Sequence, residues 1–241
     1  MFSMVSCSEV EPLDPAIVVN PNPNNPNNPN NPGNPSTSTG DYWPAALDNQ
    51  WVFQRNGTTQ PAMKMVSINS INGHTYYTFN EQSGTTTTGG MTGMAVTRLR
   101  KTGADYYIKI EDIIMPAANG VPASTTTGSE TILLRDDLPV GGTWTSSYTQ
   151  TTTYNDPLFP VIAIDFVING TIMEKGSEIT VAGETYTDVI KTKYVQNTTM
   201  MGQTSSTTTY YWFAKDIGPV RMLTETDPAD LNSELISYIL N

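Results

Sequence analysis

The sequence predicts an all-β, mainly antiparallel protein, in which a single β-rich domain of the half-barrel or curled-sheet type follows a disordered N-terminal tether. Two observations predict the domain. Thr, aromatic and β-branched residues recur at short intervals from Asp41 onward, and such residues favour strands over helices. Asn-Gly pairs, which favour tight hairpins, stand between strand-like runs at Asn56, Asn72 and Asn169. A third observation, an Asn/Pro-rich tract before residue 41, predicts the tether.

The tether is expected to span residues 7–40. Asn-Asn-Pro recurs every three residues from Asn24 to Pro32, within a tract that runs from residue 20 to residue 35. Proline removes amide donors there and Asn offers nothing to bury, so no core can offset the entropy of ordering. At ~3.1 Å per residue in polyproline-like geometry, this tract would reach roughly 50 Å. Residues 41–241 are enough for one sizeable core and are expected to fold as a single domain.

Several runs in the domain have the residue pattern of strands. Val161–Ile168 is almost entirely apolar, which predicts a strand covered on both faces, and the Asn169-Gly170 pair after it predicts a turn. Tyr106–Ile110 alternates, with Tyr107 and Lys109 on one face and the other three residues on the opposite face. The other expected strands are Trp51–Arg55, Val66–Ile71, His74–Phe79 and Thr171–Glu174.

The C-terminal residues fit two structures. Asp227-Pro228 could cap a helix that places four large apolar or aromatic side chains on one stripe. Leu235–Leu240 could equally form a closing strand. We favour the strand, because the sequence before it is β in character throughout.

Three features recur in the same order in both halves of the domain. A Pro precedes a Trp that begins a strand, an apolar-x-Gly-x-Thr-Tyr motif follows, and a run that ends in Gly then leads into a further strand. We therefore expect two similar antiparallel sheet units, at about residues 43–114 and 139–224, that share one core. The three features end at Trp51, Tyr76 and Gly103 in the first unit and at Trp144, Tyr186 and Gly218 in the second.

Charge and residue counts exclude several classes of function. The net charge is −11, from 12 Lys and Arg against 23 Asp and Glu, and the basic residues are scattered, which argues against a nucleic-acid partner. His74 is the one His and Cys7 the one Cys, so neither a Cys/His zinc site nor a disulfide framework can form. A Ser-His-Asp triad could use only His74, which follows a turn and is expected to be exposed. No cofactor is expected.

Carboxylates supply two further candidates. Asp136-Asp137 and Glu111-Asp112 are adjacent in sequence, so on strands the two members of each pair face opposite sides. We therefore expect solvated turn residues there and no hydrolase pair. A second set of residues near the C-terminus offers oxygen ligands for Ca²⁺. It lacks the central Gly and the ligand order of an EF-hand loop, so the alternative interpretation is an acidic surface loop without a metal. This weak calcium candidate consists of Asp227, Asp230, Asn232 and Glu234.

Aromatic and apolar residues suggest two kinds of ligand surface. Trp43 and Trp212 are our first candidates for exposed rings that face a glycan or a protein, with core packing as the alternative. A carrier or sensor of an apolar ligand would instead need an unfilled concavity. The residues expected to line such a concavity are Ile108, Ile110, Ile162, Ile164 and Val189.

The N-terminus resembles a processed lipoprotein. Met4-Val5-Ser6-Cys7 resembles the end of a lipoprotein signal, in which an apolar residue and two small residues precede the acylated Cys. Ser8-Glu9-Val10-Glu11 resembles the acidic export signal of some gram-negative surface lipoproteins. The resemblance implies that residues 1–6 are the remnant of a signal and that acylated Cys7 anchors the chain in the outer membrane or at the cell surface. An ordinary free thiol is the alternative.

Motifs in the domain resemble uncharacterised gram-negative lipoproteins whose β-rich domain is a LolA/LppX-like half-barrel. Relatives of the LolA type hold acyl chains on the concave face, so the resemblance implies a non-catalytic binding or structural domain that holds an apolar ligand. A glycan- or protein-binding surface module and a hydrolase without a recognisable motif are the alternatives. The motifs are Trp43-Pro44, Leu138–Trp144, Val181–Tyr186 and Tyr210–Arg221.

Overall fold

The computed structural model describes residues 37–80, 82–88, 91–118 and 120–241, and for residues 82–94 within these ranges it describes the backbone alone. The expected signal remnant, the acyl-bearing Cys7 and the linker as far as residue 36 therefore lie outside the described residues. In the described part of the chain, no helix is long and apolar enough to cross a membrane.

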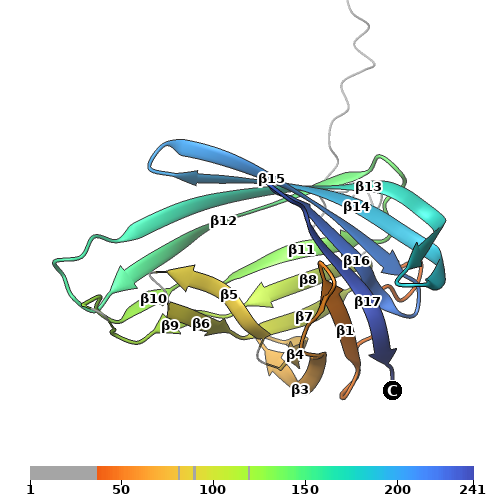
Figure 1. The fold of residues 1–241 in the computed structure, drawn as a ribbon, viewed down its shortest axis with the longest axis horizontal. Helices are drawn as coiled ribbons and strands as arrows, with labels where there is room; N and C mark the ends of the chain where they lie inside the picture. The colour runs from red at the N-terminus through yellow and green to blue at the C-terminus, as the bar shows by residue number, and fades with distance from the viewer. Residues whose placement is uncertain (1–36, 81, 89–90, 119) are drawn as a thin grey trace, which may run out of the picture. The chain divides into compact units, whose positions relative to one another are not determined.

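The described residues form seventeen strands and no helix (Figure 1), which confirms the all-β fold class. The C-terminal residues form a strand, as favoured above. The strands of the N-terminal half are β1 (Gln50–Arg55), β2 (Thr58–Thr59), β3 (Met63–Ile71), β4 (His74–Phe79), β5 (Gln82–Thr88), β6 (Met91–Ala95), β7 (Thr97–Thr102), β8 (Asp105–Ile110), β9 (Ile113–Met115), β10 (Ser124–Thr126) and β11 (Ser129–Arg135). Those of the C-terminal half are β12 (Thr143–Tyr154), β13 (Ile162–Val181), β14 (Glu184–Met200), β15 (Gln203–Ala214), β16 (Gly218–Glu225) and β17 (Leu231–Ile239).

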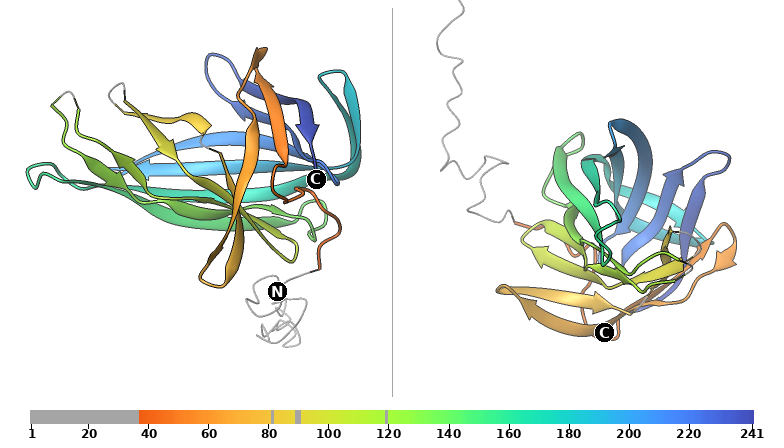
Figure 2. Two further views of the ribbon diagram at one scale, coloured as in Figure 1. Left: turned by 90° about the horizontal axis from the view of Figure 1, so that it is seen from below. Right: turned by 90° about the vertical axis from the view of Figure 1, so that its left-hand side faces the viewer.

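Fifteen of these strands form one antiparallel sheet, in the order β11-β8-β7-β4-β3-β1-β17-β16-β15-β14-β13-β12-β10-β9, with β2 paired to β1. The strands β5 and β6 form a separate hairpin. The two halves of the chain join where β1 pairs with β17, with Trp51 opposite Tyr238. The sheet curls but is not closed into a barrel, and its order ends at β11 and β9 (Figure 1, Figure 2). The predicted internal repeat stays a prediction. One of its features is present in both halves, because Trp51 and Trp144 are each the second residue of a strand.

The three Asn-Gly pairs have two different roles. Asn56-Gly57 and Asn72-Gly73 form turns after β1 and β3, with positive φ at both residues of each pair (45° and 81°, 51° and 80°), as predicted. Asn169-Gly170 lies inside β13, so the predicted turn is wrong. A Cβ on Gly170 would lie 2.3 Å from Cε2 of Trp144, the residue directly opposite on β12. This glycine provides room for an indole ring.

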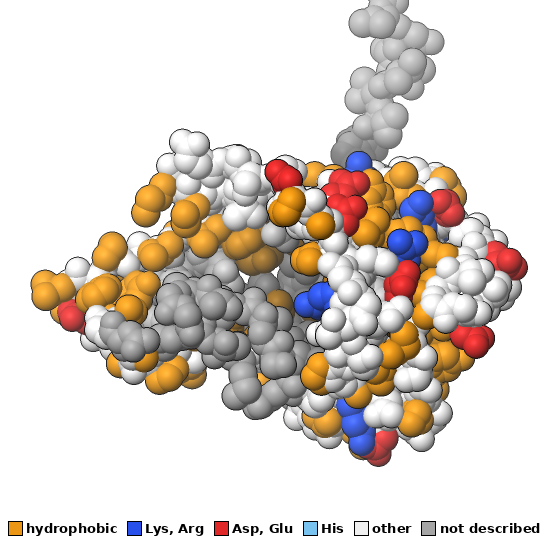
Figure 3. Space-filling model, in the orientation of Figure 1, with side chains coloured by type: hydrophobic (Ala, Val, Ile, Leu, Met, Phe, Trp, Pro, Cys, Tyr) orange, Lys and Arg blue, Asp and Glu red, His pale blue; other side chains and the backbone are white. Residues whose placement is uncertain are grey.

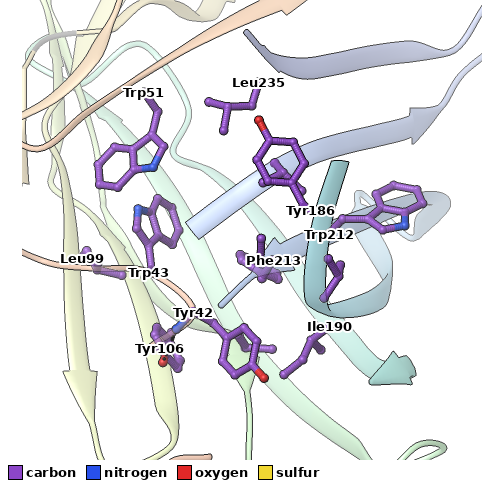
Figure 4. Packing of buried hydrophobic residues seen from close by; sticks show 14 of the residues in the cluster. Tyr42, Trp43, Trp51, Leu99, Tyr106, Tyr186, Ile190, Trp212, Phe213 and Leu235 are labelled. Carbon is purple, nitrogen blue, oxygen red and sulfur yellow. Dashed lines mark hydrogen bonds between the residues drawn. The ribbon is translucent and has the colours of Figure 1, made fainter. Parts of the chain in front are cut away.

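Four aromatic residues from distant parts of the chain pack together in the core, and Figure 4 shows three of them, Trp43, Trp51 and Phe213. The ring centroid of Trp43 lies 6.2 Å from that of Trp51, 5.7 Å from Phe79 and 6.3 Å from Phe213. The indole Nε1 of Trp51 donates a hydrogen bond of 2.7 Å to the carbonyl of Ile217. The aromatic rings therefore connect the segment before β1 with strands of both halves of the sheet.

The β13–β14 hairpin covers one end of the curled sheet. Register shifts along β13 bend it, and Asp188 in β14 has a positive φ of 51°. Beyond these points, Val181 and Tyr186 are buried in the core. Figure 1 shows the tip of this hairpin turning over the right-hand end of the sheet. We call this the closed end, and we call the opposite end, where the β9–β10, β12–β13 and β14–β15 connections lie, the distal end.

Side chains from the other half of the sheet hydrogen-bond to the backbone of Ile132 in the edge strand β11. Among the described residues β11 pairs with β8 alone, so its other edge has no strand hydrogen-bonded to it. The amide of Ile132 donates to Oγ of Ser146 at 3.2 Å. The carbonyl of Ile132 accepts from Nε1 of Trp144 at 3.1 Å and from the hydroxyl of Tyr194 at 3.4 Å. The edge is thus held against β12 and β14 without a strand-to-strand ladder.

Candidate functional site

The inner side of β12, β13 and β14 continues beyond the core toward the distal end. Directly opposite residues share a face, so Trp144, Gly170 and Tyr194, which lie in contact in the core, identify the inner side. Every second residue from these three toward the distal end faces the same way. We call this stretch the distal concave face, and it comprises Tyr148, Gln150 and Thr152 of β12, Ile162, Ile164 and Phe166 of β13, and Gln196, Thr198 and Met200 of β14.

The inner side of β13 becomes progressively more exposed toward the distal end. Ile172 is 0% exposed and Ile168 is 9% exposed, and both belong to the main core cluster. Phe166, Ile164 and Ile162 continue the same apolar row but are only half-buried. The apolar lining of the sheet therefore extends past the point at which the side chains that the structure describes cover it fully.

The outer side of the same run faces solvent. Val161 is 62% exposed and Val167 is 40% exposed, so the expectation that Val161–Ile168 is covered on both faces is wrong. The strand has one inner face that is partly covered and one outer face that is open, because the sheet is a single curled layer at this end.

An aromatic pair stands on the distal concave face. The rings of Tyr148 and Phe166, opposite each other on β12 and β13, stack with centroids 4.8 Å apart and an interplanar angle of 14°. Burial raises the pKa of Tyr148, so its hydroxyl stays protonated at neutral pH. The pair therefore offers a neutral, flat and half-buried apolar surface.

The distal end is nearly free of charge. Residues 113–126, 148–167 and 196–207 contain no Lys, Arg, Glu or His, and their only charged side chains are Asp156 and Asp165. Asp165 lies on the outer face, where it accepts a hydrogen bond of 2.6 Å from Oγ1 of Thr149, and Asp156 accepts from the amide of Leu158 in the β12–β13 loop. Figure 3 shows charged side chains gathered mainly over the other end of the visible face. An uncharged apolar surface is typical of the centre of a binding interface.

Exposed apolar residues border this end. Leu158 is 88% exposed, Met201 84% and Ile114 72%, and they lie in or beside the β12–β13, β14–β15 and β9–β10 connections. A shallow pocket between two of these connections is lined by Val121 and Phe159 among others. Exposed apolar residues that gather at one end of a domain mark interaction sites more often than isolated apolar residues do.

Of the five residues expected to line an apolar concavity, the structure brings two to the distal concave face, Ile162 and Ile164. Val189 is fully buried in the core, Ile108 packs against the main core cluster, and Ile110 packs against a smaller cluster. Sequence reasoning missed Tyr148, Phe166 and Met200. The absence of Lys and Arg over the three distal segments is the signal that could have indicated them.

The two tryptophans proposed as a ligand platform are covered. Trp43 is 5% exposed in the aromatic centre of the core, so its assignment to the surface is wrong. Trp212 is 9% exposed, and its ring lies 5.3 Å from Nζ of Lys191 and 5.0 Å from Cζ of Arg221. These side chains lie against the indole, and a ring that is 9% exposed offers little surface for a sugar ring to stack on. His74 is exposed, as expected.

The calcium candidate is not assembled into a site. Asp230 Oδ1 accepts from the amide of Thr226, Asn232 Oδ1 accepts from Nε of Arg221, and Glu234 Oε2 accepts from Nε2 of Gln54. Within the part of the chain that the structure describes, no three His, Cys, Asp or Glu residues are grouped so that they could hold a metal ion. Asp227 and Asp230 lie in the exposed loop between β16 and β17, whereas Asn232 and Glu234 lie in β17 and are half-buried.

Asp136 is buried, so the expectation of a solvated turn residue is wrong for this carboxylate. It is 0% exposed and accepts hydrogen bonds from Oγ of Ser38 at 2.5 Å, from the amide of Thr39 at 3.0 Å and from the hydroxyl of Tyr106 at 3.2 Å. Its carbonyl also accepts from Nζ of Lys175. The carboxylate thus fixes Ser38 and Thr39 to the domain a few residues before the expected boundary at residue 41.

Asp136→Asn is expected to change how stability depends on pH. Burial raises the pKa of Asp136 above 3.8, although hydrogen bonds from Ser38 and Thr39 oppose this. The folded protein holds the proton to a higher pH than the unfolded chain does, so this group's contribution to stability falls as pH rises from about 3.9 through the raised pKa. The free energy of unfolding of the Asn variant, minus that of the wild type, should therefore increase across this window and level off above it. Urea unfolding at a series of pH values measures this difference, and a difference that is constant with pH would contradict the assignment.

The fold has counterparts among solved structures. One is the crystal structure of a putative lipoprotein from Parabacteroides distasonis, which aligns with a TM-score of 0.52 and 12% sequence identity and covers 83% of this chain and 99% of that one. This chain shares that protein's fold. A putative exported protein with a YmcC-like fold from Bacteroides fragilis aligns with a TM-score of 0.42 and 14% identity, covering 83% of this chain and 100% of that one. No protein-family model and no curated protein sequence matches the chain.

Proposed function

We propose that the protein is a lipid-anchored protein of the outer membrane or cell surface of a gram-negative bacterium, and that its β domain binds an apolar ligand on the distal concave face without catalysing a reaction. The observation that carries the binding role is the row Phe166, Ile164 and Ile162, which continues the core of the sheet but is left half-buried. Apolar surface that leaves water on ligand binding contributes roughly 25 cal/mol per Å².

The anchor rests on sequence, and two findings support it. The chain shares its fold with a protein described as a putative lipoprotein. Among the described residues, Ser38 is already held to the domain by Asp136, and Cys7 lies 31 positions before it in the sequence. A LolA/LppX-like relationship remains a prediction.

A non-catalytic role is supported by how the carboxylates are used. Asp136 holds the start of the domain, and Glu111 pairs with Arg98 and Lys109. The glycan-binding alternative was based on exposed rings at Trp43 and Trp212, and both side chains are covered.

The binding role is tested with the full chain carrying Cys7→Ser, so that no acyl group occupies the site. The fluorescent probe N-phenyl-1-naphthylamine, which is neutral and apolar, is titrated into the protein. Phe166→Ser should weaken its Kd about tenfold or more, since the loss of a large apolar contact removes roughly 1.5 kcal/mol or more.

Val167→Ser is the matched control, because Val167 is the next residue of the same strand and lies on the outer face, 40% exposed. Its Kd should stay within about twofold of the parent, which corresponds to less than about 0.5 kcal/mol. Circular dichroism shows that both variants remain folded. Equal losses in the two variants, or no binding by the parent, would refute the proposed site. Mass spectrometry of an organic extract of the parent then identifies any ligand that co-purifies.

A further inference from the structure

The inner side of β12–β15 carries no charged side chain from Tyr148 to the distal end. Its polar residues are amides and hydroxyls: Gln150 and Thr152 on β12, Gln196 and Thr198 on β14, and Gln203, Ser205 and Thr207 on β15. Gln196 Nε2 donates to Oγ1 of Thr198 at 3.4 Å, so these two neighbouring side chains already form a neutral hydrogen-bonding group beside the aromatic pair.

The nearest charges on these strands point away from this side. Asp165 faces outward with Thr149, and Lys191 and Lys193 lie against Trp212 and Tyr210 on the outer face. The two lysines alternate with Thr192, which is fully buried on the inner side. A carboxylate or phosphate that packs against the half-buried side chains of the distal concave face would therefore lose part of its hydration without gaining a cation from these strands.

We infer that the ligand of the distal concave face is an uncharged apolar molecule, whose polar group, where it has one, is a hydroxyl, an ester or an amide. This inference rests on the proposed binding role of the same face and adds the chemical class of the ligand. Hydroxyl and amide side chains hydrogen-bond such groups, and an unpaired ionised group is strongly disfavoured where half-buried rings exclude water.

The test compares two molecules with the same twelve-carbon chain, 1-monolauroylglycerol and laurate, as competitors of N-phenyl-1-naphthylamine on the full Cys7→Ser chain at pH 8. Monolauroylglycerol should displace the probe at a concentration at least tenfold lower than laurate. Equal displacement by the two would overturn the inference and leave the proposed binding site intact. A failure of the probe itself to bind, in the same titration, would overturn the proposed site.

A substitution that should gain binding of a charged ligand provides a second test of the inference. Thr198→Lys places a cation on the distal concave face and should strengthen laurate binding at least tenfold, with little change for monolauroylglycerol. Thr199→Lys is the matched control, because Thr199 is the next residue on β14, faces outward and hydrogen-bonds to Thr204. The control should leave both ligands unchanged. An equal gain for laurate in both lysine variants would show a general charge effect and would overturn the inference.

Discussion

Replacing Gly170 with alanine should destabilise the domain by about 3 kcal/mol, at the upper end of what overpacking costs. A loss of stability is an unusual result for a Gly-to-Ala substitution inside a strand. In the middle of a strand, Ala is ordinarily more stable than Gly by roughly 0.5–1 kcal/mol, because Gly loses more backbone freedom on folding. Here the added Cβ would lie 2.3 Å from Cε2 and 2.4 Å from Cζ2 of Trp144.

The indole of Trp144 cannot move aside easily. It is 6% exposed, its Nε1 donates to the carbonyl of Ile132, and its ring meets that of Tyr194 edge to face with centroids 5.7 Å apart. A shift of the ring would break the contact that holds the β11 edge. The strain should therefore appear as lost stability and not as a small local adjustment.

A double-mutant cycle tests this explanation. Trp144→Leu alone should cost about 3 kcal/mol, because it removes a large buried ring. In that background, Gly170→Ala should cost less than about 1 kcal/mol, because the atoms that collide with the new Cβ are gone. Urea unfolding of the four proteins gives the coupling energy. Additive effects of the two substitutions would contradict the close packing of Gly170 and Trp144.

Cys7→Ser should release the chain from the membrane completely. Two or more acyl chains contribute ~0.8 kcal/mol per buried CH₂ and anchor a protein stably, so the loss of the residue that would carry them removes the proposed anchor. The measurement is the partition of the protein between membrane and soluble fractions of the cells that naturally produce it, together with the mass of its N-terminal peptide.

Ser8→Ala is the control for the anchor, since it alters the neighbouring residue and keeps the thiol. It should remain in the membrane fraction with an acylated N-terminal peptide. If the Cys7→Ser chain still sediments with membranes, or if the wild-type peptide carries no acyl mass, the lipoprotein assignment is wrong and Cys7 is a free thiol.

Local chemistry in the sequence was enough to predict the fold class and two of the three Asn-Gly turns. At Asn56-Gly57 and Asn72-Gly73 the backbone needs positive φ at both residues, and the pair supplies it without help from distant residues. Asn169-Gly170 carries the same local signal but lies mid-strand, because Trp144, 26 positions earlier, needs the space above the glycine. The pair alone could not distinguish these cases.

Burial was harder to predict than strand position, because burial also depends on residues far away in the sequence. Asp136 looks like a turn residue next to Asp137, and its contacts with Ser38 and Thr39, 98 and 97 residues away, together with the hydroxyl of Tyr106, make it a buried acceptor. The apolar run from Val161 to Ile168 indicated a strand correctly. How far the core extends along that strand depends on the curl of the whole sheet, which no local pattern specifies.

The pairing of β1 with β17 has a consequence for when the protein can fold. Gln50 lies opposite Ile239, and the amide of Asn241 donates to Asn49 across 192 residues of sequence. Pairings of such high sequence separation form slowly, because a long loop must close before they gain any contact. The first strand therefore has no partner on its β17 side until the last strand has been synthesised. A chain built in this way cannot complete its sheet while the ribosome is still producing it, and an incompletely folded polypeptide is the form that can be threaded through a translocation channel before the last pairing forms on the far side.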